Sequence, residues 1–220
     1  MKIIDHLFQV GGDALSAPGD AAVYLAAFED SAALIDAGCG HGHTRIIDNI
    51  SRCIAPSAAI KYLFITHCHY DHIGGADAFR KHYGCKIVAH EHDARFIEAG
   101  NNEVTAAAWY GACLEPFSVD YKIKGDSELF QLGSSTIQAL HCPGHSPGSV
   151  VYLAEINGEK VLFGQDVHGP LHPSLLSNRE DYIMSLTRLA DLEADILCEG
   201  HYGVIKGKEE VRRFIQSFIR

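Results

Sequence analysis

The segment Phe64–Gly75, FITHCHYDHIGG, places three histidines and one aspartate within six residues, directly after an apolar run. Neutral imidazole and carboxylate groups are ligands for zinc and other first-row metals. By chance, this spacing is expected in about one of a few hundred such chains. The cluster also follows an apolar strand, and strand ends are where α/β proteins build their sites. We therefore interpret the segment as part of a metal site.

The spacing within the segment predicts two neighbouring metal positions. His67 and His69 are two residues apart, so in an extended chain both point the same way and can converge on one cation. Asp71 and His72 follow and can reach a second position beside the first. The two glycines after them are expected to let the backbone turn sharply before the next helix.

Four side chains cannot complete two coordination shells, so more ligands are expected at other strand ends. His145 lies in ALHCPGHSPGS between two apolar strands, and Asp166 in VLFGQDVHGP follows another. His201 in DILCEGHYG comes after a strand and a glycine. Each distant residue alone is a weak signal, but the pattern at four strand ends is strong. The candidate metal ligands are His67, His69, Asp71, His72, His145, Asp166 and His201.

Composition and charge restrict the partners. The formal net charge is −10 and no run of Lys or Arg occurs, so the surface would repel a nucleic-acid backbone. The longest apolar stretch, residues 21–28, is too short to cross a membrane, and the N-terminus lacks the apolar region of a secretory signal. Seven scattered cysteines without a CxxC pair fit a reducing compartment. We expect a cytoplasmic protein that acts on a small molecule; homo-oligomerisation stays open.

The hydrophobic pattern predicts one α/β domain over residues 1–220, with two sheets and helices outside them. No linker or low-complexity segment divides the chain. Residues 101–119 are expected to be irregular. Helices are expected at 43–54, 76–84, 91–100, 177–193 and 208–220. Strands are expected at 3–10, 21–28, 31–38, 61–66, 85–90, 120–123, 128–133, 135–141, 149–156, 160–164 and 195–200.

The motifs together resemble the metallo-β-lactamase-fold hydrolases. THCHYDHIGG is followed by PGHSPG, GQD and EGHYG, and ALIDAG precedes it, so the resemblance covers nearly the whole chain. It implies an αββα sandwich with a two-metal centre at one edge. It also implies two divalent metal ions, with zinc favoured and iron or manganese compatible. The first metal would be held by His67, His69 and His145, the second by Asp71, His72 and His201, and Asp166 would bridge them.

The resemblance implies hydrolysis as the reaction. Two cations about 3.5 Å apart can share a hydroxide at neutral pH and still polarise a substrate oxygen. By analogy, Asp71 is the catalytic residue that orients this hydroxide or relays its proton. A metal would stabilise the tetrahedral oxyanion formed from a carbonyl. An ester, thioester or lactone is therefore the expected substrate.

Asp166 helps to choose a branch within the family. The glyoxalase II-like thioesterases and the lactonases have such a bridging aspartate, whereas true zinc β-lactamases lack it; a turn role for Asp166 is the alternative. The residues after it, VHGPLHPSLLSNRED, lack the basic and aromatic groups that receive glutathione, and only one short helix follows His201. A glutathione thioester is therefore disfavoured. Lactonase, β-lactamase and one-iron persulfide dioxygenase activities remain alternatives.

Three residues are candidate substrate contacts: Trp109, Tyr110 and His168. Core packing is slightly favoured for Trp109, and a hydrophobic lip over the metals is the alternative. Tyr110 could donate a hydrogen bond to the substrate carbonyl. His168 lies just after Asp166, and the chance that it contacts the substrate is taken as no better than even. Cys68 is expected to pack inward, because its neighbours point to the metal.

Overall fold

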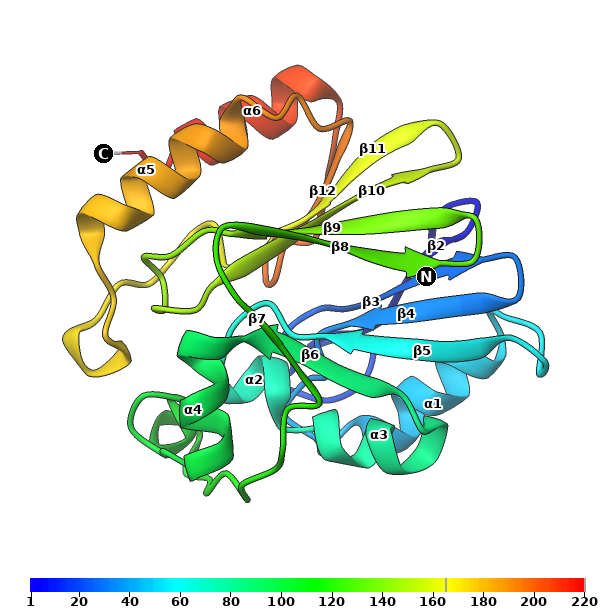
Figure 1. Cartoon of the computed structure of the whole chain (residues 1–220), viewed down its shortest axis with the longest axis horizontal. Coiled ribbons are helices and arrows are strands. Elements are labelled where there is room, and N and C mark those ends of the chain that lie inside the picture. Colours follow the sequence, from blue (N-terminus) through cyan, green and yellow to red (C-terminus); the bar gives the residue numbers. More distant parts are fainter. Residues whose placement is uncertain (165, 220) are drawn as a thin grey trace.

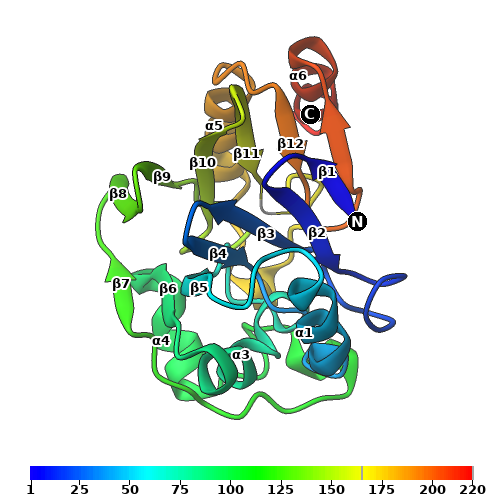
Figure 2. The same ribbon diagram turned by 90° about the vertical axis from the view of Figure 1, so that its right-hand side faces the viewer.

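A computed structural model describes residues 1–164 and 166–219. Two β-sheets pack face to face, and helices cover both outer faces (Figures 1 and 2). Helices α1 (His43–Ser51), α3 (Ala76–Tyr83) and α4 (Glu91–Ala99) lie under the first sheet. Helices α5 (Arg179–Ala190) and α6 (Lys208–Gln216) lie over the second. The predicted αββα sandwich is confirmed.

The first sheet has seven strands in sequence order. Its first four strands are antiparallel, and its last four are parallel because helical crossovers join them. The apolar run before the histidine cluster is an inner strand of this sheet. The strands are β1 (Lys2–Ile4), β2 (Leu7–Gly11), β3 (Val23–Phe28), β4 (Ser31–Ile35), β5 (Ala59–Phe64), β6 (Lys86–His90) and β7 (Tyr121–Ile123).

The second sheet has six strands, in the order β13-β12-β11-β10-β9-β8. Among the described strands of this second sheet, β11 and β12 form the only parallel pair, and the other pairs are antiparallel. The strands are β8 (Ser127–Leu132), β9 (Ser135–His141), β10 (Val150–Ile156), β11 (Glu159–Phe163), β12 (Ile196–Cys198) and β13 (Val204–Lys206). A short helix α2 (Tyr70–Ile73) and two 3-10 turns, η1 (Ala107–Tyr110) and η2 (Pro173–Leu175), complete the elements.

Three apolar layers hold the sandwich together. Phe64, Tyr152 and Phe163 are fully buried between the two sheets. Phe79 belongs to the layer under the first sheet, and Leu186 to the layer over the second. Each sheet is therefore buried on both faces over much of its area, which explains why several strands are continuous apolar runs rather than alternating ones.

The structure differs from the predicted elements in several places. Helix α2, which carries Asp71 and His72, and the turn η2 were not predicted. The strand expected at 3–10 is a hairpin of β1 and β2, broken at His6, whose φ is 68°. Residues 101–119 contain the 3-10 turn η1. Strand β13 was not predicted because it has three residues and is only partly buried, so it carries almost no periodic signal.

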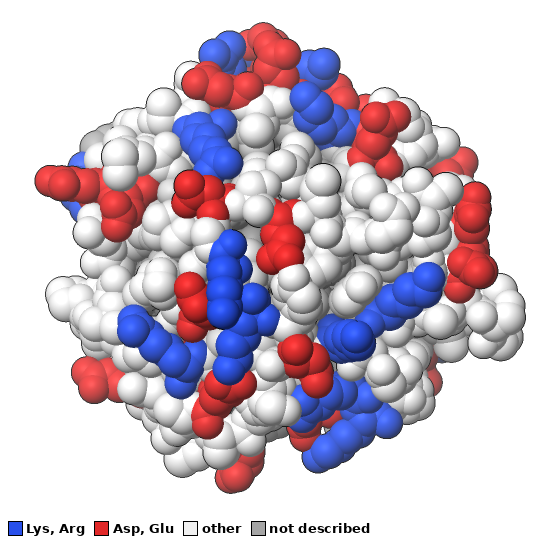
Figure 3. All heavy atoms as spheres, viewed as in Figure 1, with Lys and Arg blue, Asp and Glu red and all other residues white. Residues whose placement is uncertain are grey.

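The surface carries both charges. On the face viewed in Figure 3, Lys and Arg side chains are interspersed with Asp and Glu. Among the described residues, some charged side chains form surface pairs, such as Lys122 with Glu98 at 2.7 Å. Within residues 1–164 and 166–219, no helix combines the length and the apolar character needed to span a membrane.

Candidate metal centre

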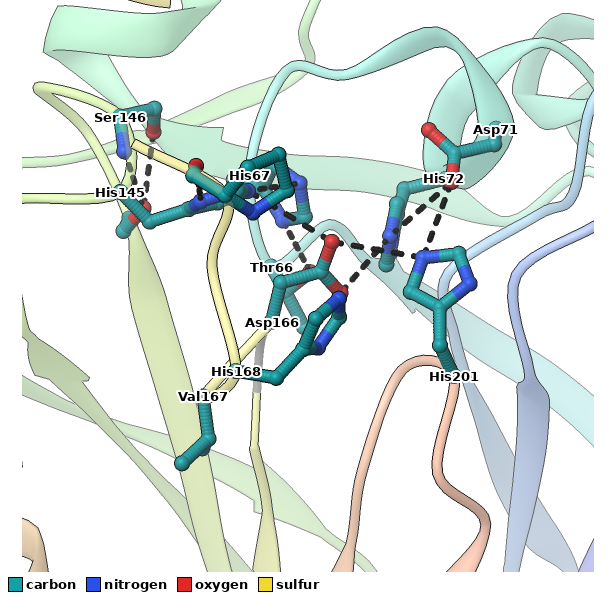
Figure 4. A network of polar contacts seen from close by, with 12 residues as sticks. Thr66, His67, Asp71, His72, His145, Ser146, Asp166, Val167, His168 and His201 are labelled. Carbon is teal, nitrogen blue, oxygen red and sulfur yellow. Dashed lines mark hydrogen bonds and ion pairs between the residues drawn. The ribbon is translucent and has the colours of Figure 1, made fainter. Parts of the chain in front are cut away.

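The candidate ligands meet at one edge of the sandwich. Asp71 and His72 lie on the short helix α2, and the other candidates lie on the loops after β5, β9, β11 and β12, so both sheets contribute (Figure 4). The structure brings all seven side chains together, although their role as ligands stays a prediction. His201 is partly exposed. The other six are buried and each at most 4% exposed: His67, His69, Asp71, His72, His145 and Asp166.

The first group consists of His67, His69 and His145. One nitrogen of each ring lies within 4.8 Å of the others. The Nε2 atoms of His67 and His145 are 3.2 Å apart. In two of these rings the opposite nitrogen has a hydrogen-bond partner: Nδ1 of His67 lies 3.0 Å from the Thr66 hydroxyl, and Nδ1 of His145 lies 3.0 Å from the Pro170 carbonyl. Hydrogen bonds of this kind aim the free nitrogen of a ligand histidine.

The second group consists of Asp71, His72 and His201, whose ligand atoms also lie within 4.8 Å of one another. Nε2 of His201 is 3.1 Å from Oδ2 of Asp71. Nδ1 of His72 donates a hydrogen bond to Oδ2 of Asp36 at 2.7 Å. This bond places Nε2 of His72 on the side of the other ligands.

Asp166 lies between the two groups (Figure 4). Its Oδ1 is 3.2 Å from Nε2 of His72. Its Oδ2 is 3.3 Å from Nε2 of His201 and 3.6 Å from Nε2 of His145. One carboxylate thus faces a member of each group, the arrangement expected of a bridging ligand.

The donor atoms fit metal ions. Nε2 of His69, Nε2 of His72 and Oδ1 of Asp166 are buried without a hydrogen bond, in the part of the chain that the structure describes. Buried polar atoms are normally paired, because an unpaired one costs about 1–3 kcal/mol. Three such atoms on neighbouring side chains, spread over both groups, point to bound metal ions as their missing partners. Imidazole and carboxylate donors suit zinc and other first-row metals.

The two groups differ in their electrostatics. Burial, with the neighbouring histidines, holds the pKa of His67 well below its usual value. Burial also lowers the pKa of His69 and His145. These rings are therefore neutral, as metal ligands must be. For His201, burial lowers the pKa, but hydrogen bonds to Asp166 and Asp71 outweigh it and raise the pKa to about 10. The carboxylates of Asp71 and Asp166 thus attract positive charge to the side of His201.

Two carboxylates that support these ligands were missed in the sequence. Asp36, just after β4, accepts hydrogen bonds from the backbone N–H and the hydroxyl of Thr66, both at 2.8 Å, as well as from His72. Glu199, just after β12, is fully buried and holds the loop of His201. An acidic residue directly after a buried strand was the available signal in both cases.

The glycines near the site have a different role from the expected one. Gly74 and Gly75 have ordinary negative φ values of −57° and −88°, so they do not provide an unusual turn. Instead, a Cβ on Gly74 would lie 2.3 Å from the carbonyl oxygen of Cys39, and one on Gly75 would lie 2.3 Å from that of Ala37. They are needed because another segment passes very close.

A cavity of about 200 Å³ opens beside the ligands. Trp109 and Tyr110 line it and are 52% and 43% exposed, so the slight preference for a core position of Trp109 was wrong. Cys68 is fully buried among apolar side chains. The cavity is lined by His69, Asp71, Ala106, Trp109, Tyr110, His145, Asp166, His168, Pro170, Leu175 and His201.

Comparison with known proteins identifies relatives of the same kind. The chain is 28% identical to the probable metallo-hydrolase YqgX of Bacillus subtilis, over 84% of this chain and 86% of that protein. It is 30% identical to the hydroxyacylglutathione hydrolase GloC of Haemophilus influenzae, over 86% of this chain and 89% of that protein. It is 28% identical to the chicken (Gallus gallus) acyl-coenzyme A thioesterase MBLAC2, over 70% of this chain but only 60% of that protein.

Solved structures agree on the fold. The metallo-β-lactamase BJP-1 of Bradyrhizobium japonicum superimposes with a TM-score of 0.79 at 22% identity, over 99% of this chain and 89% of that one. Identity this low supports the fold and not the activity. The family model of the metallo-β-lactamase superfamily matches residues 17–201. The chain therefore belongs to the metallo-β-lactamase superfamily of hydrolases.

Proposed function

We propose that the protein uses two divalent metal ions, with zinc favoured, to hydrolyse a thioester or ester carbonyl of a small molecule. The position of Asp166 carries the proposal. Its two oxygens face His72 on one side and His145 and His201 on the other, at 3.2–3.6 Å. His67, His69 and His145 would hold one ion, Asp71, His72 and His201 the other, and Asp166 would contact both.

Metal ions bound there would supply a hydroxide at neutral pH and polarise the carbonyl oxygen. Asp71 is placed to orient the attacking water, because its carboxylate lies in the cavity wall. Burial raises the pKa of Asp71, but the charge of His72 and the hydrogen bond from His201 outweigh it and lower the pKa. Asp71 is therefore ionised, so its oxygens can accept a hydrogen bond from the attacking water.

The cavity supports a small or weakly charged carrier group. None of the described residues that line it is Lys or Arg, whereas glutathione and coenzyme A, named for two relatives, are both anionic. Trp109 and Tyr110 at the mouth offer aromatic surface and one hydroxyl. In this proposal, Tyr110 donates a hydrogen bond to the carbonyl, and Trp109 and His168 contact the rest of the substrate.

Metal analysis and a substrate screen test the proposal. Purified protein loaded with Zn²⁺ should hold two ions per chain, and matched thioesters, esters and lactones should be cleaved faster than nitrocefin. Incubation with glutathione persulfide under air tests for dioxygenase activity, which would be seen as oxygen consumption. Efficient nitrocefin cleavage without any esterase, thioesterase or lactonase activity would refute the substrate class. Oxygen consumption by an iron-loaded form would assign the protein to a different reaction.

A further inference from the structure

Asp93 is a fully buried carboxylate that the proposed reaction does not use. It lies on α4. Its Oδ2 accepts hydrogen bonds from the backbone N–H of Cys68 at 2.8 Å and from the Ser146 hydroxyl at 2.6 Å. Its Oδ1 accepts one from the backbone N–H of Gly148 at 2.6 Å. Three donors from two separate loops thus meet on one side chain.

These donors belong to the two loops that carry the first group of candidate ligands. Cys68 stands between His67 and His69 on the loop after β5, in the first sheet. Ser146 directly follows His145 on the loop after β9, in the second sheet. The carboxylate therefore ties together two loops that come from different layers of the sandwich.

The packing around Asp93 leaves little freedom. A Cβ on Gly148 would lie 2.5 Å from the Asp93 nitrogen and 2.7 Å from its Cγ, so only glycine allows this approach. The Ser149 hydroxyl accepts a hydrogen bond from the Ser146 N–H at 3.0 Å and lies 2.8 Å from its Oγ. A carboxylate accepts hydrogen bonds only, which matches three donors; an amide would present a donor to at least one of them.

The second group is held by other carboxylates. Asp36 accepts the hydrogen bond from His72, and Glu199 accepts those from the backbone of His201 and Tyr202. No hydrogen bond described for Asp93 reaches this group. A change at Asp93 should therefore act on one metal position and spare the other.

We propose that Asp93 is a positioning residue that sets the separation of His145 from His67 and His69, and thereby the affinity of the first metal position. The inference rests on the proposed function, because it requires that these histidines bind a metal. It assigns Asp93 no contact with the metal or the substrate.

The test compares metal binding by three variants. Asp93→Asn keeps the shape but replaces an acceptor by a donor. Ser146→Ala removes one of the three hydrogen bonds to Asp93, together with the contact between the Ser146 and Ser149 hydroxyls. Asp20→Asn is the matched control: Asp20 is also buried and accepts bonds from a serine hydroxyl at 2.5 Å and a backbone N–H at 2.8 Å, but not from the loops of the first group. Co²⁺ and Zn²⁺ affinities are measured by chelator competition, the Co²⁺ absorption spectrum reports ligand geometry, and thermal unfolding reports the fold.

Asp93→Asn should weaken one of two metal positions about 10- to 100-fold, the usual effect of losing a partner behind the ligands. Ser146→Ala should weaken the same position less, and Asp20→Asn should leave it unchanged. Wild-type affinity at both positions in Asp93→Asn and Ser146→Ala overturns the inference, as does an equal loss at both positions in all three variants. If Asp93→Asn does not fold, the metal affinity of Ser146→Ala decides whether the inference holds. A wild-type chain that binds no metal refutes the proposed function instead.

Discussion

The carboxylate of Glu199 accepts a hydrogen bond from Nδ1 of His168 at 2.8 Å. Its other oxygen accepts hydrogen bonds from the backbone N–H groups of His201 and Tyr202, at 2.7 and 2.8 Å. Glu199 is fully buried, and Tyr24 donates a hydrogen bond to its carbonyl oxygen at 2.7 Å. One side chain thus fixes a candidate substrate contact and the loop of a candidate metal ligand.

Replacement of Glu199 by Gln should therefore weaken the second metal position. The amide of Gln would present N–H groups to the ring of His168 or to the backbone N–H groups of His201 and Tyr202, which are donors themselves. The loop of His201 would therefore shift. We expect a loss of about 10-fold or more in affinity at that position, with the first position unchanged. Chelator competition with Zn²⁺ measures this. His168→Ala is the control, because it leaves the backbone bonds to Glu199 intact; it should reduce kcat/KM while both metals stay bound. Equal metal affinity in Glu199→Gln and the wild type would contradict the prediction.

Replacement of Asp71 by Ala should reduce the turnover rate strongly while the folded protein still binds metal. Asp71 faces the cavity, whereas the first metal position depends on three histidines that this change does not touch. We expect at least one metal ion to stay bound and kcat to fall by about a hundredfold or more. Metal content and kcat on a confirmed substrate measure the two effects. His67→Ala, which removes a ligand of the first position, should lose metal and activity together. Near-wild-type turnover by Asp71→Ala would exclude the proposed role.

That the candidate ligands lie together could be predicted, because they occur in short motifs at strand ends. His67, His69, Asp71 and His72 lie within six residues, and the three distant candidates each follow an apolar strand. The αββα layers were predicted from the family resemblance, because the periodicity of hydrophobic residues does not determine which strands are neighbours. The pairing of β11 with β12, for example, joins segments separated by α5.

The partners of the supporting carboxylates could not be predicted, because they are distant in the sequence. Asp36 binds Thr66, 30 residues away, and Asp93 binds Ser146, 53 residues away. Such pairs have no spacing that a single sequence can reveal; only the folded chain brings them together. The exposure of Trp109 was misjudged for a similar reason, since its place at the cavity depends on how η1 packs beside α2.

Replacement of Gly200 by Ala should displace Asp166. A Cβ at this position would lie 2.2 Å from Oδ1 of Asp166 and 3.0 Å from Cε1 of His72, so the carboxylate must move. Because Asp166 faces both groups of ligands, we expect lower affinity for both metal ions and at least a tenfold loss of kcat/KM. Two-site Zn²⁺ titration distinguishes this pattern from the one-site effect of Glu199→Gln. Unchanged binding of both ions in Gly200→Ala would mean that Asp166 is not needed between them.

Replacement of His90 by Asn should flatten the pH dependence of stability. His90 is 2% exposed, its ring stacks on that of His141 at 3.9 Å, and its Nε2 has no hydrogen bond among the described residues. Burial, with the nearby His141 and His92, lowers its pKa from 6.5 to about 4. Between these values the unfolded chain binds a proton that the folded chain does not, so acidification favours unfolding.

The expected size follows from the two pKa values. Between pH 7.5 and pH 5.0, His90 should remove about 2 kcal/mol from the free energy of unfolding of the wild type. Asn does not titrate, and its side chain can still accept the hydrogen bond that His90 takes from the N–H of His92 at the start of α4. At pH 7.5 the variant should be less stable than the wild type, because its smaller side chain leaves space. On acidification to pH 5.0, its free energy of unfolding should fall by about 2 kcal/mol less than that of the wild type. Urea unfolding of the metal-free proteins at both pH values measures the difference, and the other histidines largely cancel in the comparison. Equal losses in the two proteins would show that His90 is not held neutral by the fold.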